Sequence, residues 1–591
     1  MTRERILRGI PVSPGIVLGG IYLYTSALPD IPEYDVPLEQ VEQEVRRWEA
    51  AVTETRDELA RLRTRYGRTK DITDIISVLL LLLEEADIRQ QTIEFIRQRR
   101  RNAEFAYSQV TRRIAAPLAG SQVAFVREKI ADINDITQRV LRHLLHLPVP
   151  SLYDAPPGAI IIAQDLLPSE TTTLDSGRVG AVALEAGGKT THAALMLKAK
   201  EIPLLVGIER LVDRVQRLAP ADAVPRPALL DAYRGLIIIS PSPRRLEYYK
   251  QEQQRLERRR SLLFKQLDQE PVTSDGRHID IMANAELPAD CDTARRYHAR
   301  GIGLFRSEYL ILAKRRIPDE QEQYELFAQA ARTLKPYPVV IRTFDLGGDK
   351  VLPGYTETNP FLGWRAIRYC LDNQDFFKTQ LRAILRASAL GNVRLMFPMI
   401  ATLEELRRAK LILNQTRDEL RKAGVQFDEQ LPIGCMVEIP SAALLASTLA
   451  RETDFLSIGS NDLTQYTLAV DRGNQKVARL YDPLHPAVLR LIKLTIDAAH
   501  DSEITAALCG ELASDPFGLI ALIGLGIDEL SMVPAMIPQA IAVIRALDRN
   551  IAREIAQKLI QFDTPLEVHR HLHREIHRRL PDLANLLPDA Q

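Results

Sequence analysis

The sequence has few of the features that disulfide-built, membrane-embedded or nucleic-acid-coating proteins require. It holds only four cysteines, with no CxxC spacing, which argues against a disulfide scaffold and favours a reducing compartment. No apolar run approaches the roughly 20 residues that a transmembrane helix needs, and no signal-peptide core follows the first residues. Net charge is also absent, because 77 Lys and Arg balance 77 Asp and Glu. The expectation is a soluble, cytoplasmic protein that is not a nucleic-acid coat.

What the sequence does contain is a globular composition, 46% hydrophobic and 26% charged, over a length that suggests several domains. Strand patterns occupy residues 6–24 and return in short β-branched runs between residues 159 and 240. Between them, residues 37–147 show apolar stripes at helical spacing, beginning with Val41, Val45 and Trp48. We therefore expect one α/β domain, residues 1–36 and 148–242, interrupted by an all-helical bundle over residues 37–147.

The C-terminal half has a different rhythm. Residues 243–268 are charged and Leu-spaced, which favours a solvated linker helix. From residue 278 onward, eight short apolar runs alternate mostly with helical patterns in under 280 residues. That count and length predict a (β/α)8 TIM barrel, with C-terminal helices, over residues 269–591.

Polar side chains follow the ends of several predicted barrel strands, where barrel enzymes build their active sites. Arginines at these ends can clamp an anion, since guanidinium matches phosphate and carboxylate in a bidentate manner. Two carboxylates suit Mg²⁺, which is bound by a few carboxylates together with substrate oxygens. A small phosphorylated carboxylate with Mg²⁺ would satisfy both sets, and structural salt bridges across the barrel mouth are the alternative. The residues are Arg306, Arg342 and Arg472 for the anion and Glu438 and Asp462 for the metal.

A second motif, AGGKTTH at residues 186–192, lies between a strand pattern and a helical pattern in the α/β domain. Gly187 and Gly188 permit a tight turn, and the helix N-terminus offers free N–H groups to an anion. His192 stands there with Thr190 and Thr191 as hydroxyl partners, and could accept a phosphoryl group. From the motif alone, an ordinary surface histidine is an equally good interpretation of His192.

Taken together, the motifs resemble the Enzyme I family of the bacterial sugar phosphotransferase system, the phosphoenolpyruvate–protein phosphotransferases. The most specific string is IGSNDLTQYTLAVDRG at residues 458–473. The other matching strings, which together span nearly the whole chain, are at residues 13–16, 187–192, 301–308, 342–350, 359–368 and 509–513.

The resemblance implies a function and assigns roles to residues. It implies that phosphoenolpyruvate binds the barrel with Mg²⁺, that the phosphoryl group passes to His192 in a swivelling domain, and that Cys509 protonates the enolate to release pyruvate. It further implies transfer to a histidine of the carrier protein HPr, docked on the helical bundle, as the first step of sugar uptake, and a homodimer through the barrel. The implied substrate-binding residues are Arg306, Arg342, Asn461, Arg472, Lys350 and Arg365, and the implied metal ligands are Glu438 and Asp462.

Some positions depart from the family pattern. Leu79 stands where relatives often have histidine, and Asn134 replaces an arginine; both are expected on the HPr-docking face, which makes the partner less certain. In the helix after His192, Lys198 replaces an arginine, which keeps the charge but loses the planar fork.

Two other functions compete with this interpretation. A pyruvate phosphate dikinase or phosphoenolpyruvate synthase would need an ATP-binding domain, and the sequence holds no glycine-rich nucleotide loop for one. A catalytically silent docking protein should have lost His192, Cys509 or a metal ligand, and none is lost. Separately, His569, His573 and His577 recur every four residues; a metal site is one explanation and a solvated amphipathic helix is the favoured one.

Overall fold

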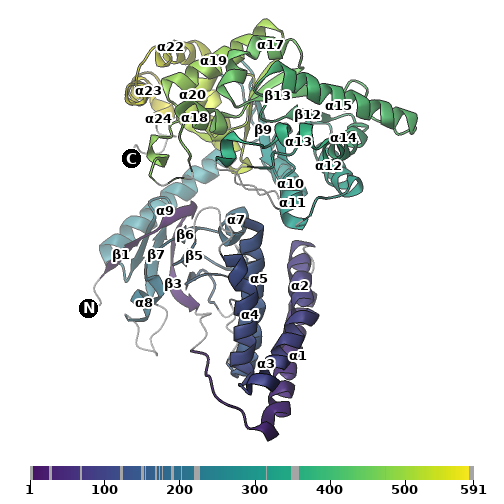
Figure 1. Cartoon of the computed structure of the whole chain (residues 1–591). Helices are drawn as coiled ribbons and strands as arrows, with labels where there is room; N and C mark the ends of the chain where they lie inside the picture. The colour runs from purple at the N-terminus through teal and green to yellow at the C-terminus, as the bar shows by residue number, and fades with distance from the viewer. Residues whose placement is uncertain are drawn as a thin grey trace. The chain divides into compact units, whose positions relative to one another are not determined.

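The computed structural model divides into two compact units, residues 1–258 and 259–591 (Figure 1). We describe each unit by itself. The described residues are 4–24, 30–66, 70–119, 124–147, 152, 155–166, 170–171, 174–175, 177–187, 192–200, 202–217, 226–314, 316–347, 359–472, 474 and 476–584.

The first unit contains an eight-stranded sheet in the order β1-β8-β7-β3-β4-β5-β6-β2. Its strands are β1 (Arg5–Arg8), β2 (Ile10–Ser13), β3 (Ile16–Tyr24), β4 (Ile160–Ala163), β5 (Ala181–Leu184), β6 (Leu204–Val206), β7 (Pro227–Asp231) and β8 (Leu236–Ile239). The pairs β3–β4, β4–β5 and β5–β6 are parallel, and the remaining pairs are antiparallel. The strands before and after the helical insertion therefore pair in one sheet.

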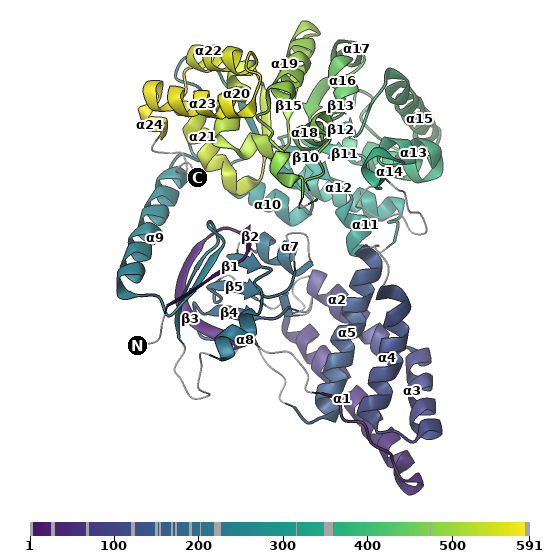
Figure 2. The same cartoon turned by 60° about the vertical axis from the view of Figure 1, so that its left-hand side comes forward.

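The central strands of this sheet are buried on both faces, which explains their continuous apolar sequence. Ile161 of β4 packs in one cluster with Leu197 of α7 (His192–Ala199). Its neighbour Ile160 packs in another cluster with Leu211 of α8 (Leu211–Gln216). Because successive side chains of a strand point to opposite faces, α7 and α8 cover opposite faces of the sheet (Figure 2).

The helical insertion forms a bundle with its own core. Its helices are α1 (Val41–Tyr66), α2 (Lys70–Leu83), α3 (Ala86–Arg99), α4 (Ala103–Ala119) and α5 (Ala124–Leu144). The stripe predicted on the first helix is confirmed, since Val41, Val45 and Trp48 are buried in the bundle core. Trp48 also packs against the ring of Tyr107 on α4, with centroids 6.0 Å apart.

One expectation about this bundle is wrong. Leu79 does not lie on a docking surface, because it is only 1% exposed and packs in the bundle core. An apolar side chain in α2 is drawn inward by the same hydrophobic effect that orders the other core residues. Asn134 on α5, by contrast, is exposed.

The helix α9 (Pro243–Phe264) follows the sheet. Its first half packs on the sheet through Tyr249, which is buried in a cluster with Leu229 and Ile238.

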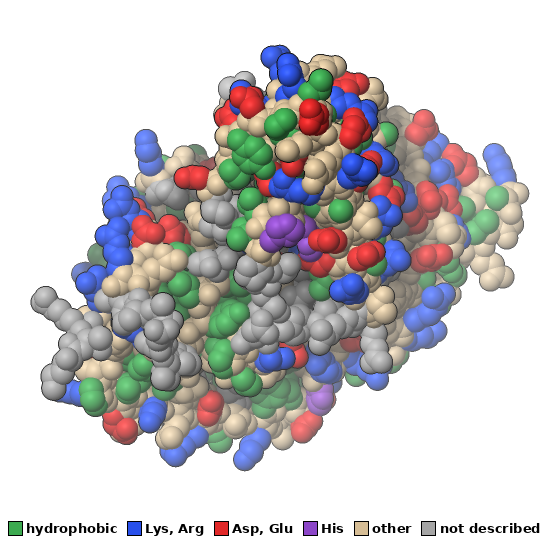
Figure 3. Space-filling model, turned by 90° about the horizontal axis from the view of Figure 1, so that it is seen from below, with side chains coloured by type: hydrophobic (Ala, Val, Ile, Leu, Met, Phe, Trp, Pro, Cys, Tyr) green, Lys and Arg blue, Asp and Glu red, His purple; other side chains and the backbone are tan. Residues whose placement is uncertain are grey.

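Over the face drawn in Figure 3, Lys and Arg side chains lie interspersed with Asp and Glu side chains. Neither sign of charge dominates this face.

The second unit is a closed barrel of eight parallel strands, as predicted. The strands are β9 (Asp280–Ala285), β10 (Ile302–Arg306), β11 (Val339–Arg342), β12 (Val393–Phe397), β13 (Ile433–Val437), β14 (Phe455–Ile458), β15 (Thr505–Leu508) and β16 (Glu529–Met532). The helices are α10 (Pro288–Arg296), α11 (Tyr309–Lys314), α12 (Glu320–Leu334), α13 (Ile367–Asp372), α14 (Gln374–Ser388), α15 (Leu403–Lys422), α16 (Pro440–Leu444), α17 (Ala446–Ala450), α18 (Ser460–Leu468), α19 (Pro486–Asp501), α20 (Pro516–Leu525), α21 (Ile537–Ala546), α22 (Arg549–Leu559), α23 (Pro565–Arg579) and α24 (Pro581–Ala584).

The barrel interior is a packed core rather than a channel. Leu304, Val340, Met396, Met436 and Phe455 fill it, together with Cys509. Residues beside them in the strands, such as Phe305 and Ile341, face the surrounding helices in a second and larger cluster. This alternation leaves the strand ends as the place where polar side chains can gather.

The row of histidines on α23 makes contacts with other parts of the barrel unit. His569 pairs with Asp482 over 2.8 Å, and the ring of His573 packs on Phe517 with centroids 4.6 Å apart. Within the described part of the chain, no group of three or more His, Cys, Asp or Glu side chains is arranged to hold a metal ion. Nor does any described helix have the length and apolarity to cross a membrane.

Candidate active site

The site begins with a buried arginine at the end of β11. Arg342 donates from Nη2 to Glu308, which follows β10, over 2.6 Å, and lies 3.3 Å from Asp345. All three side chains are at most 7% exposed. Burial alone would lower the pKa of Arg342, but the two carboxylates outweigh it and raise that pKa, so the guanidinium stays charged.

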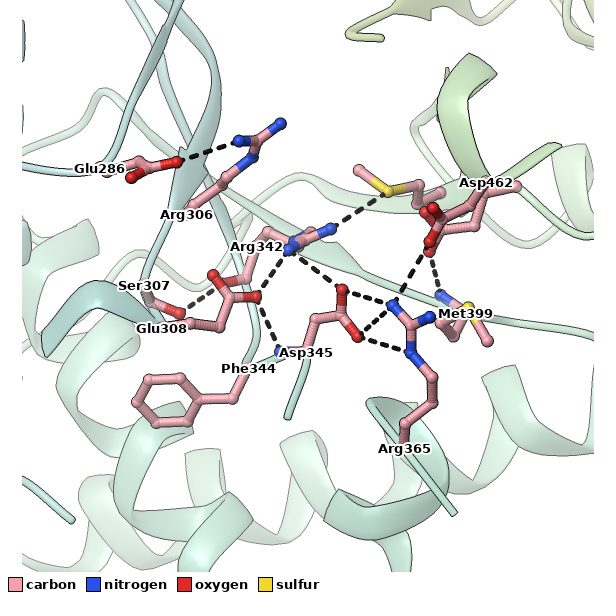
Figure 4. Close-up of polar contacts among 12 residues, drawn as sticks. Glu286, Arg306, Ser307, Glu308, Arg342, Phe344, Asp345, Arg365, Met399 and Asp462 are labelled. Atoms are coloured by element: carbon pink, nitrogen blue, oxygen red, sulfur yellow. Dashed lines mark hydrogen bonds and ion pairs between the residues drawn. The ribbon is translucent and has the colours of Figure 1, made fainter. Parts of the chain in front are cut away.

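A second arginine shares one of these carboxylates. Arg365 donates from Nη2 to both carboxylate oxygens of Asp345 at 2.9 Å, and also to Asp462 on α18 at 3.3 Å. Its Nη1 donates to the hydroxyl of Tyr466 at 3.1 Å. Figure 4 shows Asp345 lying between the two guanidinium groups. Side chains from β10, β11, α18 and the segment before α13 therefore meet in one network.

The network does not use all the hydrogen-bond donors of the Arg342 guanidinium. Its Nε is buried, and none of the described residues accepts a hydrogen bond from it. Among the residues that the structure describes, its Nη1 has the sulfur of Met436 as its partner, at 3.8 Å. Buried donors are almost always paired in folded proteins, so an unpaired one at a barrel mouth fits an anionic ligand.

Two carboxylates adjoin the arginines. Glu438 follows β13, is 3% exposed, and accepts from the backbone N–H of Met399 at 2.7 Å. Burial, reinforced by the negative charge of Asp462, raises the pKa of Glu438. Gly459 gives this carboxylate room, because a Cβ at that position would lie 2.8 Å from Glu438 Oε2. The two acids repel each other, and a cation between them would relieve that repulsion.

The carboxylates of Glu438 and Asp462 are ligands of the type that Mg²⁺ prefers, but two are too few to complete its coordination. Two carboxylates are a normal share for Mg²⁺, which takes its remaining ligands from water and substrate phosphates. They are too few for a metal site made of protein groups alone, in keeping with the absence of a larger ligand cluster among the described residues. Glu438 and Asp462 therefore suit a metal that arrives with its substrate.

A thiol lies inside the mouth of the barrel. Cys509 follows β15, is 3% exposed, and accepts a hydrogen bond from the hydroxyl of Ser457 at 3.5 Å. Burial raises the pKa of Cys509, which keeps the thiol protonated. Glu511, two residues further along the chain, is 79% exposed and lies 3.9 Å from Arg472.

The remaining predicted barrel residues lie at the more exposed edge. Arg306 is 39% exposed and donates to Glu286 at 3.0 Å. Asn461 accepts from the backbone N–H of Glu511 at 2.9 Å, which ties α18 to the segment after β15. Arg472 is 47% exposed. Half-exposed arginines can move to a ligand at little cost, whereas Arg342 and Arg365 are fixed.

The motif of the α/β domain is described only in part. Gly187 has a φ of +95°, a conformation that favours glycine, so the turn after β5 has a reason for this residue. His192 is the first residue of α7. Gly188, Thr190, Thr191 and the barrel residue Lys350 lie outside the described residues.

Sequence reasoning missed two contributors. Ser457 contacts the thiol, and Tyr466 joins Arg365 to the carbonyl of Phe361, to which its hydroxyl donates at 2.5 Å. The sequence could have pointed to Ser457, because it is the one hydroxyl-bearing residue in the buried strand FLSI. Tyr466 gave none, because aromatic residues are common on helices that pack against a barrel.

Comparisons with known proteins agree across the chain. Residues 260–549 match the PEP-binding domain of PEP-utilising enzymes, residues 155–235 their mobile domain, and residues 8–129 their N-terminal part. A phosphoenolpyruvate-protein phosphotransferase of Bacillus sp. (strain S) is 40% identical over 90% of this chain and 91% of its own. That of Geobacillus stearothermophilus has the same identity and coverage, and that of Bacillus subtilis (strain 168) is 37% identical over 89% and 92%.

Among solved structures, an NMR structure of Enzyme I matches 42% of this chain and 99% of its own, with 25% identity and a TM-score of 0.38. The sequence relatives decide the family, because their identity extends over nine-tenths of both chains. The chain therefore belongs to the PEP-utilising enzymes, in the family of phosphoenolpyruvate–protein phosphotransferases.

Proposed function

We propose a course for the reaction of this phosphoenolpyruvate–protein phosphotransferase in which His192 receives the phosphoryl group and passes it to a carrier protein. The bond between phosphorus and the enol oxygen of phosphoenolpyruvate breaks, and a phosphorus–nitrogen bond forms on the imidazole. The other product is the enolate of pyruvate. A histidine at the first position of a helix supports this role, because an anion is favoured beside free N–H groups.

Arg342 and Arg365 bind the anionic substrate in this proposal. Arg342 offers its buried Nε, which no described residue engages. Pairing with Glu308 and Asp345 fixes both guanidinium groups before the substrate arrives, so little reorganisation is needed as charge shifts toward the leaving oxygen. Arg306, Asn461 and Arg472, at the exposed edge, close on the phosphate and carboxylate, and Lys350 supplies a further positive charge.

Glu438 and Asp462 would hold Mg²⁺ together with the substrate phosphate. When bound, the metal supplies positive charge that neutralises the phosphoryl oxygens. The protein's own contribution is to keep the buried Glu438 carboxylate close to that of the partly buried Asp462, against their repulsion. The support for this assignment is the raised pKa of Glu438 and the small number of protein ligands, which leaves positions for substrate oxygens.

Cys509 delivers the proton that completes pyruvate. The enolate carbon takes the thiol proton, and the thiolate is later reprotonated from solvent. A general acid must hold its proton until that moment, and burial of Cys509 raises its pKa in the required direction. Ser457 donates to the same sulfur and stabilises the thiolate after the transfer.

The second half of the reaction needs a phosphocarrier protein, which we propose is HPr or an HPr-like protein docked on the bundle. The exposed Asn134 on α5 is the position where this partner is least certain. We also propose a homodimer through the barrel unit, supported by the exposed leucines Leu444 and Leu480. A cytoplasmic location fits the four free cysteines.

Incubation with Mg²⁺ and radiolabelled phosphoenolpyruvate tests the proposal. Wild-type protein should acquire acid-labile, alkali-stable label, and His192→Ala should acquire none. Adding HPr should then remove the label. An unlabelled wild type would refute phosphorylation of the chain, label on His192→Ala would refute the acceptor, and label that HPr leaves in place would refute the carrier.

A further inference from the structure

A short segment lies against the helix that begins at His192. We call it the strap, which here means residues 170–171 and 174–175. Lys200, just beyond the end of α7, donates from Nζ to the backbone carbonyls of Thr171 at 3.1 Å and Leu174 at 2.7 Å. Its backbone N–H continues the helix by donating to the carbonyl of Met196 at 3.1 Å. One side chain therefore joins the end of α7 to two points of the strap.

The strap also contacts α7 further toward its N-terminus. The hydroxyl of Thr171, which is fully buried, lies 3.7 Å from the sulfur of Met196. Residues four apart on a helix share a face, so positions 192, 196 and 200 form one stripe along α7. The strap touches the second and third positions of this stripe, and the first is His192.

The strap is held at its other end by the sheet. The hydroxyl of Tyr24, the last residue of β3, donates to the carboxylate of Glu170. Leu174 is buried in the same apolar cluster as Leu197 of α7. One end is thus held on β3, and the two hydrogen bonds from Lys200 join the segment to the end of α7.

A lysine in this role is unusual for a helix end. Lysines near a helix C-terminus commonly stay in water or interact with the last carbonyls of their own helix. Lys200 is instead half-buried and directs its ammonium to carbonyls of another segment. Burial lowers the pKa of Lys200, so the ammonium has lost water that the two carbonyls replace.

We propose that Lys200 is a positioning residue for phosphorylation of His192, acting by holding the strap along the His192-bearing stripe of α7. The inference rests on His192 being the phosphoryl acceptor. Lys200 touches no reacting atom in this account. It holds Thr171 beside the stripe, and a misplacement of about 1 Å near a reacting group can cost up to about a hundredfold in rate.

Single-turnover phosphorylation of the full chain by labelled phosphoenolpyruvate, with quenching at short times, tests this role. Lys200→Met removes the donors at similar length and should lower the maximal rate about tenfold. The phosphoenolpyruvate concentration giving half-maximal rate should not change, because that substrate binds the barrel. Lys200→Arg should restore most of the rate, and Lys250→Met, an exposed lysine on α9, is the matched control.

The possible results of this experiment distinguish a positioning role of Lys200 from the absence of one. A slower maximal rate with unchanged half-saturation, rescued by arginine, supports the proposal. A rate for Lys200→Met equal to that of Lys250→Met overturns it, as does a loss confined to half-saturation. If Lys200→Met does not fold, Lys200→Gln replaces it with the same expectations, since its shorter amide cannot reach both carbonyls. A wild type that takes no label would refute the acceptor role of His192 instead.

Discussion

Arg342 and Glu308 form a buried ion pair of 2.6 Å at the mouth of the barrel, where each side chain is at most 7% exposed. Arg342 is the last residue of β11, and Glu308 lies just past the end of the neighbouring strand β10, so the pairing of the two strands brings the side chains together. A charge pair held in this way fixes the guanidinium before any ligand binds, with its Nε engaged by none of the described residues. Its cost in desolvation makes a purely structural role an inefficient use of two buried charges.

Glu308→Gln should weaken substrate binding and lower stability. The amide keeps the shape and one acceptor but not the charge, so Arg342 loses its main counter-ion while remaining buried. We expect KM for phosphoenolpyruvate to rise about tenfold and the barrel to lose on the order of 2–3 kcal/mol, measured by steady-state kinetics and calorimetry. Glu286→Gln, which breaks the half-exposed pair with Arg306, should change stability by less than about 1 kcal/mol. Equal stability losses in both variants would contradict this.

Cys509→Ala should slow the formation of pyruvate and leave substrate binding intact. Loss of a general acid costs about a hundredfold to ten-thousandfold in rate, while the arginine contacts to phosphoenolpyruvate remain. Pyruvate release followed with a coupled dehydrogenase, and binding followed by calorimetry, separate the two effects. Cys291→Ala is the control, because that buried thiol lies on α10. A Cys509→Ala variant with normal turnover would remove the thiol from the mechanism.

Glu438→Gln should raise the Mg²⁺ concentration needed for activity by at least about tenfold. The neutral amide is no longer repelled by Asp462, so a cation between the two side chains gains less electrostatic energy and binds more weakly. Activity should disappear with EDTA in wild type and return with Mg²⁺ at a lower concentration than in the variant. An unchanged Mg²⁺ requirement would show that Glu438 is not a ligand.

Glu529 on β16 should make the barrel less stable as pH rises. Burial raises its pKa from 4.5 to about 7, against the opposing charge of Arg394. Between these values the folded chain keeps a proton that the unfolded chain has lost, so the free energy of unfolding falls with rising pH, by about 3 kcal/mol in total. Asp280 and Asp528 add to the same shift. Glu529→Gln should be more stable than wild type at pH 8 by calorimetry and should lose this pH dependence; equal stability there would contradict it.

The fold was largely predictable because its patterns are local. Eight apolar runs, each short and mostly followed by a helical stripe, match a barrel in number and length, and the barrel strands lie where those runs were expected. The stripe beginning at Val41 likewise needed only helical periodicity. The prediction that Leu79 lies on the docking face was wrong because it came from a family resemblance rather than from a local pattern. Whether a side chain is buried depends on what packs around it in this chain.

The gathering of polar side chains at the strand ends was predictable, but the contacts among them were not. Charges at strand ends had to meet because parallel strands end at one edge, which placed Arg342, Glu438 and Asp462 together. The sequence did not indicate that Asp345 would bridge two arginines, since that depends on rotamers of buried side chains. The contact between the Ser457 hydroxyl and the Cys509 thiol is another example, because the two residues are 52 positions apart in the sequence.

The central claim is that the barrel site transfers phosphoryl to His192, and the stoichiometry of pyruvate measures this directly. Wild-type protein mixed with excess phosphoenolpyruvate and Mg²⁺, without any carrier, should release a burst of about one pyruvate per chain and then stop, because the acceptor is filled. His192→Ala should release none, while still binding the substrate. An equal burst from His192→Ala, or continuous turnover by wild type without a carrier, would contradict the account.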